Sequence, residues 1–254
     1  MTASELFIAA VAAAAAGLVN AIAGGGTLIS FPVLLGLGVP PIAANVTNAV
    51  ALSPGYFGAT LAQLGQLRGQ ERRFRICLPA AILGGIAGAW LLLRTHEHTF
   101  QKLVPFMLLF ASLLLAFQNR VREFVVRRLA SDGDGHENLA PATVAVMLAS
   151  IYGGFFTAGM SVIVLAVLGA TLHDSLTRLN ALKQAVAFSV NIAAAVFFVF
   201  SGQVLWIVAA AMAAGAVVGG MIGGRVAGRM NADPLRWTVV AVGAGLAVYY
   251  WVRG

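Results

Sequence analysis

The stretch VNAIAGGGTLISFP, residues 19–32, places three consecutive glycines inside a region that otherwise has the composition of a membrane-spanning helix. Inside a bilayer, unpaired backbone groups are costly, so a break is tolerated only where it is buried in protein or lines a wet cavity. Glycine permits such a break and lets a ligand approach the main chain closely. A helix beginning at Gly26 would also direct N–H groups and a positive dipole end toward the break, which favours an anion. The alternative is that the glycines form only a turn or a close-packing site.

The composition of the whole chain indicates a multi-pass membrane protein. The 254 residues are 60% hydrophobic, the mean hydropathy is +0.89, and charged residues make up only 10%. Runs long enough to cross a hydrocarbon core of about 30 Å recur along the chain. Apolar segments fall at residues 5–23, 26–38, 44–66, 74–94, 99–118, 139–157, 159–170, 173–201, 204–224 and 235–252. Because two of them are short, we expect an all-α fold with 8 to 10 transmembrane segments, including broken or re-entrant helices after glycine-rich breaks.

Several other classes of protein are disfavoured by what the sequence contains. The first apolar run lacks a preceding basic region and leads into glycines, so we interpret it as a retained span rather than a signal peptide. The net charge of +7 comes from cations in short loops beside apolar segments, which indicates membrane topology and not nucleic-acid binding. Cys77 is the only cysteine, and the histidines have no metal-ligand spacing on one helix. No nucleophile or nucleotide-binding motif occurs, so we expect neither an enzyme nor a cofactor nor a metal site.

The two halves of the chain resemble each other. GGIAGAWLLLR at residues 84–94 matches GGMIGGRVAGR at residues 219–229, and VTNAV around Asn48 matches RLNAL around Asn180. The glycine break is matched by YGGFFTAGMS at residues 152–161. These matches predict a first transmembrane repeat at 1–118, a central cytoplasmic loop at 119–138 and a second transmembrane repeat at 139–254. Internal repeats of this kind are typical of transporters.

The distribution of Lys and Arg favours inverted repeats over parallel ones. If each short segment continues its neighbour, the repeats are parallel, and the better orientation puts nine cations inside and five outside, leaving out Arg178 and Lys183. If each break is instead the tip of a hairpin, the repeats are inverted, and eleven cations lie inside and three outside. The second arrangement places both termini outside, and the parallel arrangement stays open as the alternative.

Polar residues form stripes on two of the apolar segments. Asn180, Lys183 and Gln184 share one face of segment 173–201. An ionisable residue inside an apolar segment indicates function, although Lys183 could also extend its ammonium group to the membrane interface. The corresponding first-half segment carries Asn48 on its polar face. These asparagines could line a cavity or form hydrogen bonds between helices.

The acidic residues support an anionic substrate by their positions. All nine lie in predicted loops or at the edges of apolar segments. A cation carrier, or a proton relay through carboxylates, normally requires an acidic residue within the membrane. Together with Lys183 and the two predicted helix N-termini, this distribution favours an anion.

The glycine-rich break, the P-x-L-L-x-x-G pattern at residues 32–38, TN at residues 47–48 and LNALK at residues 179–183 resemble the TauE/SafE sulfite exporter family, also described as toluene-sulfonate uptake permeases. The resemblance covers essentially the whole chain. It implies a multi-pass inner-membrane permease for sulfite, sulfonates, thiosulfate or related sulfur-containing anions. The second-half break departs from the family pattern, because its glycines are thinned to TAGMS at residues 157–161.

These inferences define a candidate binding site and its partners. We expect the broken hairpins to hold a small anion near the middle of the bilayer, with transport by alternating access. A channel-like anion conductor and a non-transporting membrane scaffold are the alternatives. The lipid bilayer is the other expected partner, and the sequence leaves a homo-oligomer open. The candidate substrate-binding residues are Asn20, Gly24, Gly25, Gly26, Thr27, Asn48, Gly159, Ser161, Asn180, Lys183 and Gln184.

Overall fold

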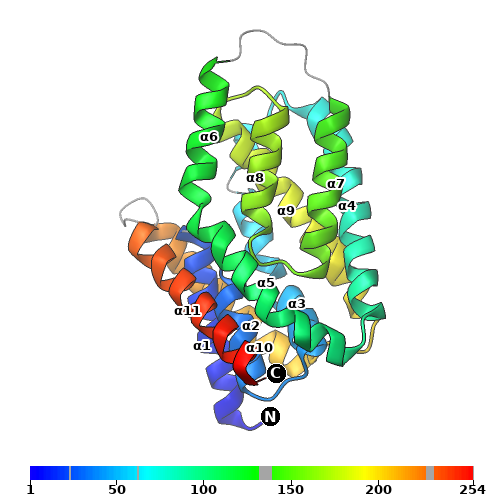
Figure 1. Cartoon of the computed structure of the whole chain (residues 1–254), viewed down its shortest axis with the longest axis vertical. Helices are drawn as coiled ribbons and strands as arrows, with labels where there is room; N and C mark the ends of the chain where they lie inside the picture. Colours follow the sequence, from blue (N-terminus) through cyan, green and yellow to red (C-terminus); the bar gives the residue numbers. More distant parts are fainter. Residues whose placement is uncertain (23, 62, 132–138, 227–231, 254) are drawn as a thin grey trace.

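The computed structural model describes residues 1–22, 24–61, 63–131, 139–226 and 232–253, and within these ranges it contains helices and no strands (Figure 1). This confirms the all-α prediction. The helices are α1 (Ala3–Ile22), α2 (Thr27–Gly36), α3 (Pro41–Leu61), η1 (Leu64–Leu67), α4 (Glu71–Arg94), α5 (Glu97–Ala116), α6 (Gln118–Ser131), α7 (Leu139–Phe155), α8 (Met160–Thr171), α9 (Leu176–Val199), α10 (Trp206–Val226) and α11 (Ala232–Arg253).

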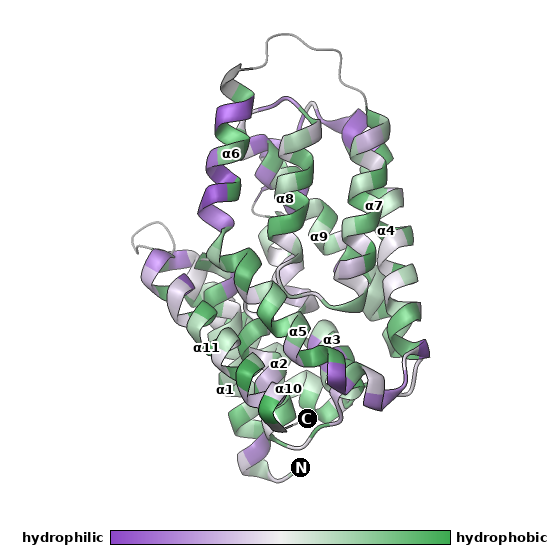
Figure 2. Ribbon diagram, in the orientation of Figure 1, coloured by the Kyte–Doolittle hydropathy of each residue, from purple (hydrophilic) through white to green (hydrophobic). Residues whose placement is uncertain are grey.

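Each predicted apolar segment corresponds to a helix whose ends differ from the prediction by only a few residues. Among the described residues, six helices are long and apolar enough to cross a membrane, namely α1, α4, α5, α9, α10 and α11. Helices α2, α7 and α8 are apolar but shorter. Figure 2 shows hydrophobic residues along the bodies of these helices, as expected for a multi-pass membrane protein. The count of 8 to 10 segments stays a prediction.

Helix α6 was not predicted, because its sequence lies in the hydrophilic stretch assigned to the central loop. Its apolar residues nevertheless recur with helical spacing at Val121, Val125 and Leu129, so that one face is apolar. Val125 is fully buried and lies where a side chain on Gly169 of α8 would have to go. Residues 119–131 of the predicted loop therefore belong to a helix that packs on α8, whereas residues 132–138 lie outside the described residues.

The helices pair in a pattern that is preserved when the two halves of the chain are exchanged. Helix α1 packs against α10, and α7, its counterpart in the second half, packs against α4. Helix α3 likewise packs against its counterpart α9, and α5 packs against α11. Every one of these pairs joins the first half to the second, so neither half forms a separate globule.

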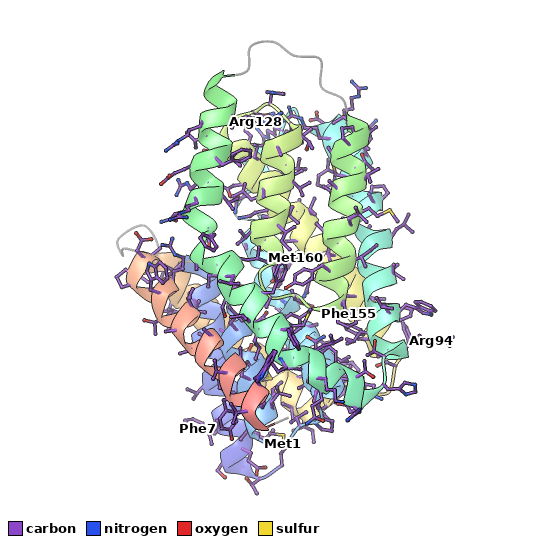
Figure 3. The ribbon with its side chains drawn as sticks, viewed as in Figure 1. Met1, Phe7, Arg94, Arg128, Phe155 and Met160 are labelled. Carbon is purple, nitrogen blue, oxygen red and sulfur yellow. The ribbon has the colours of Figure 1, made fainter. Side chains whose placement is uncertain are left out.

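The second break is the tip of a hairpin in the middle of the molecule. Phe155, the last residue of α7, and Met160, the first of α8, both lie near mid-height (Figure 3). Helices α7 and α8 run side by side from this tip, and α1 and α2 also contact each other. The first turn of α1 and the last turn of α11 lie at the same end of the molecule (Figure 1). This is the hairpin arrangement that inverted repeats require, although the repeat organisation itself stays a prediction.

Glycines bring the paired helices into backbone contact. A Cβ atom on Gly219 of α10 would clash with the backbone of Ala14 in α1, and one on Gly84 of α4 would clash with the backbone of Met147 in α7. These two glycines are the matched positions of the aligned stretches GGMIGG and GGIAGA. Small residues allow such close approach between membrane helices. The matched sequence positions therefore make matched contacts.

Replacing Gly219 by alanine is expected to destabilise the protein by about 1–3 kcal/mol, because the added methyl group overpacks a backbone contact. Gly224 lies on the same helix with no atom within 4 Å of the Cβ position. Gly224→Ala is therefore expected to be neutral or to stabilise the protein by about 0.5–1 kcal/mol through helix propensity. Thermal unfolding in detergent measures both, and equal melting temperatures for the two variants would contradict the packing role of Gly219.

Candidate functional site

The first break consists of two glycines in the left-handed region, followed by the start of α2. Gly24 and Gly25 have φ angles of 80° and 85°, which are strained for any other residue. The Gly24 N–H donates to the Val19 carbonyl at 3.0 Å, and the Gly26 N–H donates to Asn20 Oδ1 at 3.4 Å. Among the N–H groups of residues 24–27, those of Gly25 and Thr27 have no hydrogen-bond partner among the described residues.

The second break has a similar turn with one glycine in place of two. Gly159 has a φ angle of 79° and is the N-cap of α8. Tyr152 in α7 donates from its hydroxyl to the Ala158 carbonyl at 2.7 Å, which ties the turn to the preceding helix. Ser161 lies half-buried in the first turn of α8. The thinned glycine pattern of the sequence therefore still produces a left-handed turn.

Helix α5 passes both breaks within little more than one helical turn. The Leu115 side chain fills the space beside Gly25, and Leu114 and Ala111 fill the space beside Gly159. Phe31 of α2 and Phe156 of the second break are fully buried and stack edge to face, with ring centroids 5.3 Å apart. The two breaks, which are far apart in sequence, are therefore neighbours in the fold.

Helix α3 connects the two breaks along one face. Asn45 donates from its side-chain amide to the Phe155 carbonyl at 2.8 Å, at the end of α7. Further along the same face, Tyr56 interacts through its hydroxyl with Asn20, the residue that binds Gly26. These two contacts are about 16 Å apart along the helix axis, at about 1.5 Å per residue.

Asn48 lies between these two contacts, one turn after Asn45. Its side chain is only 1% exposed, and its Oδ1 atom has no hydrogen-bond partner among the described residues. Most buried polar atoms are hydrogen-bonded, so an unpartnered one needs an explanation. The structure therefore places a buried, unsatisfied amide oxygen on the helix face that joins the two breaks.

The polar stripe on α9 lies against the far end of α3. Lys183 donates from Nζ to Asn180 Oδ1 at 3.1 Å, and Thr60 of α3 donates to the Gln184 carbonyl at 3.4 Å. Arg122 of α6 lies close enough to act on Lys183 electrostatically. Among the described residues, no hydrogen bond joins this stripe directly to either break. The predicted site residues therefore form two groups, one at the breaks and one on α9, which are linked through Tyr56 and Thr60 of α3.

Asn191, which shares the stripe on α9, has a structural role. Its side chain accepts a hydrogen bond from Ser53 at 2.7 Å and lies 3.5 Å from the Ala49 carbonyl. Ser53 precedes Pro54, which lies inside α3 and provides no backbone N–H to that helix. The contact between α3 and α9 is therefore stabilised beside this proline. Asn191 forms hydrogen bonds between helices, which was one of the two roles considered for the asparagines of these stripes.

The acidic residues that the structure describes lie at helix starts, in a junction or on α6. Four of them lie in the first turns of their helices, one precedes α9, and one lies on the exposed side of α6. They are Glu5, Glu71, Glu97, Asp233, Asp174 and Glu123, while Asp132, Asp134 and Glu137 lie outside the described residues. For the described residues, this agrees with the sequence-based prediction that no carboxylate lies in the middle of a span.

An ion-pair cluster between the two halves was not predicted from the sequence. Asp174, before α9, forms ion pairs with Arg73 of α4 and, at 2.8 Å, with Arg178. Gln70 is almost fully buried beside them and donates to the Arg178 carbonyl at 3.1 Å. We define these four residues as the junction cluster. It joins the start of α4 to the start of α9, and loop composition alone does not predict such pairing.

The junction cluster is expected to make stability depend on acid pH. Burial raises the pKa of Asp174, but hydrogen bonds from Arg178, Arg73 and the Ser175 N–H, together with the Arg73 charge, outweigh it and hold the pKa below its ordinary value of 3.8. A carboxyl group whose pKa is lowered by folding contributes stability above its unfolded pKa, and this contribution is lost as the pH falls through the folded pKa. The contribution of Asp174 is therefore present at neutral pH and disappears below about pH 4.

Asp174→Asn is accordingly expected to lower the free energy of unfolding by about 2 kcal/mol at pH 7. This is less than the 3–5 kcal/mol expected for breaking a fully buried pair, because the Arg178 side chain is 31% exposed. The difference from wild type should shrink below about pH 4. Thermal unfolding of both proteins as a function of pH measures this difference. Glu123→Gln, which changes an exposed pair with Arg127, is the control and should have little effect. A pH-independent difference for Asp174→Asn would contradict the assignment.

Comparisons with known proteins agree with this architecture. A curated protein described as "Probable membrane transporter protein" from Haemophilus influenzae is 29% identical over 202 residues, covering 78% of this chain and 76% of that protein. "Probable membrane transporter protein ORF9" from Sinorhizobium sp is 29% identical over 217 residues, covering 80% and 75%. "Probable membrane transporter protein YfcA" from Escherichia coli K12 is 22% identical over 191 residues, covering 75% and 69%. No solved structure matches the chain.

The family comparison covers nearly the whole chain. The profile described as "Sulfite exporter TauE/SafE" matches residues 9–250, which include both breaks and most of every paired helix. The match confirms the resemblance inferred from the glycine-rich break and its flanking motifs. The chain therefore belongs to the TauE/SafE sulfite exporter family and is a multi-pass membrane transporter.

Proposed function

We propose that this transporter moves sulfite, or a related sulfur-containing anion such as a sulfonate or thiosulfate, across the membrane by alternating access. The substrate would bind where the two breaks meet on α3. The observation that carries this proposal is the buried, unpartnered Oδ1 of Asn48, which lies between the contacts of α3 with the two breaks. The Gly25 and Thr27 N–H groups would donate to the anion, and the start of α2 adds a favourable dipole.

The amide of Asn48 complements these donors. An unpaired carbonyl oxygen favours a ligand that donates a hydrogen bond, as hydrogen sulfite or an amino- or hydroxysulfonate can. Asn180 holds the Lys183 ammonium at 3.1 Å, and we place this positive charge on the route between the site and the solvent. The described carboxylates lie away from the middle of the spans, so the field along this route favours an anion over a cation.

The packing of the helices suggests which of them would move together as rigid bodies during transport. Close glycine contacts join α1 to α10 and α4 to α7, and each of these pairs contains one helix from each half. Tightly packed backbone does not slide freely, so we propose that one body forms around α1 and α10 and the other around α4 and α7. Rocking between these bodies would expose the site to alternate sides, with helices α3 and α9 at their boundary.

Transport in proteoliposomes tests the proposal. A carrier shows saturable uptake of radiolabelled sulfite, and unlabelled sulfite trapped inside accelerates entry of the label by counterflow. Uptake that stays linear in sulfite concentration without counterflow would support the channel-like alternative. If sulfite, thiosulfate and simple sulfonates are neither transported nor able to raise the melting temperature, the substrate assignment is wrong and the scaffold alternative gains support.

A further inference from the structure

Two adjacent pockets meet at Asp174, where the two halves of the chain join. The first has a volume of about 170 Å³ and is lined by Gly69, Gln70, Arg72, Arg73, Asp174 and Arg178, and we call it the arginine pocket. The second has a volume of about 400 Å³ and lies between α6 and the junction of α8 with α9, and we call it the apolar pocket. A polar pocket beside a larger apolar one matches a ligand with a charged head and a hydrocarbon tail.

The arginine pocket has an excess of positive charge. Three guanidinium groups, those of Arg72, Arg73 and Arg178, line it with one carboxylate, that of Asp174. Asp174 pairs with Arg73 and with Nε of Arg178, while Nη1 of Arg178 donates to the Arg68 carbonyl. Nη2 of Arg178 and the exposed side chain of Arg72 have no hydrogen-bond partner among the described residues. These donors suit an oxyanion such as a phosphate group, which arginine binds through paired hydrogen bonds.

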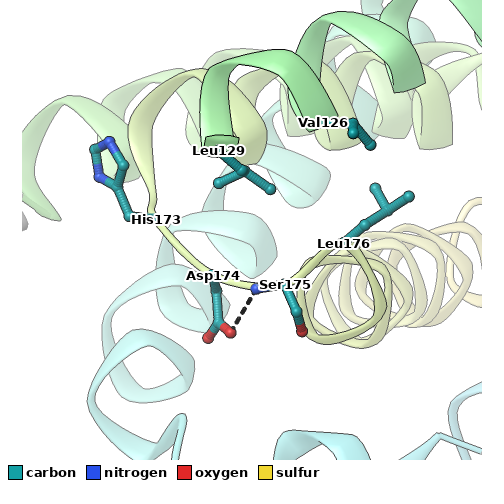
Figure 4. Close-up of a pocket in the computed structure, with 6 residues that line it drawn as sticks. All are labelled: Val126, Leu129, His173, Asp174, Ser175 and Leu176. Atoms are coloured by element: carbon teal, nitrogen blue, oxygen red, sulfur yellow. Dashed lines mark hydrogen bonds between the residues drawn. The ribbon is translucent and has the colours of Figure 1, made fainter. Parts of the chain in front are cut away.

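The apolar pocket is lined by hydrocarbon side chains from two helices and by His173, Asp174 and Ser175 of the segment between α8 and α9. Val126 and Leu129 of α6 face Leu176 of α9 across the pocket, and Asp174 and Ser175 lie along one edge (Figure 4). Val126 is 47% exposed, so the pocket is open at the surface of the protein. Apolar surface of this kind gains free energy when hydrocarbon covers it.

The exposed side of α6 has the composition of a helix that lies against charged lipid. Arg120 and Arg127 are exposed on it, together with the aromatic side chain of Phe124. Basic residues beside exposed aromatic and aliphatic side chains are typical of contact with anionic lipid headgroups. Figure 2 shows that α6 is strongly hydrophilic, in contrast with the spans beside it. Charge complementarity therefore favours an anionic lipid over a zwitterionic one.

We infer that one anionic phospholipid binds at this junction, with its phosphate in the arginine pocket and part of an acyl chain in the apolar pocket. The lipid would contact Arg72 of the first half and Leu176 of the second half. Because it binds both halves in this arrangement, it stabilises their association. The site is distinct from the paired breaks and does not depend on which anion is transported.

The test is the thermal stability of the full-length protein in detergent with added phosphatidylglycerol, phosphatidylcholine or inorganic phosphate. Phosphatidylglycerol is expected to raise the melting temperature by about 5 °C, and the other two additives should have little effect. Arg72→Gln should lose at least half of this shift. The matched control is Arg75→Gln, which removes the same charge from an exposed position of α4 outside the pocket.

Two substitutions test the apolar pocket that is proposed to hold the acyl chain. Val126→Trp would fill the apolar pocket and should reduce the shift, whereas Val144→Trp, at an exposed position of α7 outside the pocket, should not. Native mass spectrometry should show phosphatidylglycerol retained by wild type and by both controls. The proposal is wrong if phosphatidylcholine or inorganic phosphate reproduces the whole shift. It is also wrong if Arg72→Gln and Arg75→Gln respond alike.

Discussion

Asn48→Leu is expected to reduce sulfite transport by more than about tenfold without lowering the melting temperature. The Asn48 amide oxygen is buried without a partner, and such a group costs about 1–3 kcal/mol in the folded state. Leucine has a similar volume and no polar atom, so the variant should be at least as stable as wild type. Loss of activity with gain of stability is the pattern expected of a residue retained for binding.

Asn191→Leu is the matched control, because Asn191 is also buried in a central helix but has its hydrogen bonds satisfied. This variant removes the hydrogen bond between Ser53 of α3 and Asn191 of α9 and should lower the melting temperature. Comparison of transport per folded molecule with thermal unfolding separates the two roles. If Asn48→Leu transports normally, or if it unfolds at a lower temperature than Asn191→Leu, Asn48 is a packing residue and the proposed site is misplaced.

Lys183→Met is expected to lower transport by about 10- to 100-fold, since hydrogen bonds to charged groups contribute about 1.5–3 kcal/mol. Methionine preserves most of the aliphatic stem, so packing around α9 should be kept. Asn180 holds the Lys183 ammonium at 3.1 Å, and no carboxylate is bonded to it among the described residues. The ammonium charge is therefore available to a passing anion.

The chain has a second lysine, which provides the control. Lys102 lies exposed near the start of α5, and Lys102→Met removes the same charge without touching the proposed route. Initial rates of sulfite uptake, normalised to the amount of protein in the liposomes, measure both variants. Equal rates for the two methionine variants would contradict a role in transport and favour the interpretation that Lys183 only extends toward the membrane interface.

The sequence alone predicted the local features of the fold well. Apolar runs located the helices of the spans, because burial in a bilayer requires long apolar segments whose backbone is satisfied internally. Glycine runs located both left-handed turns, at Gly24 and at Gly159, because other residues are strained there. Glycine pairs spaced by four residues are typical of close helix packing, and Gly84 with Gly88 and Gly215 with Gly219 lie at such contacts. In the third pair, Gly220 lies beside Gly17 of α1, whereas Gly224 has no atom within 4 Å of its Cβ position.

Contacts between residues far apart in the chain could not be predicted from the sequence. The pattern placed Asn48 on the polar face of its segment. It did not show that, on the same helix, Asn45 binds the second break while Tyr56 contacts Asn20 at the first. Asn48 and Asn191 looked alike in sequence, yet only Asn48 has an unpartnered atom. The structural role of an asparagine depends on what its neighbours supply, and these neighbours come from other helices.

The sequence by itself determined the class of protein, the positions of the spans and both breaks, and the absence of acidic residues from the middle of the spans that the structure describes. These properties follow from local composition, since hydrophobicity and glycine conformation act residue by residue. Only the tertiary structure decided that α5 and α3 bring the breaks together, that α6 is a helix packed on α8, and that Asp174 joins the two halves through Arg73. These depend on how helices from the two halves pack, and packing is a property of pairs of surfaces that no single segment contains.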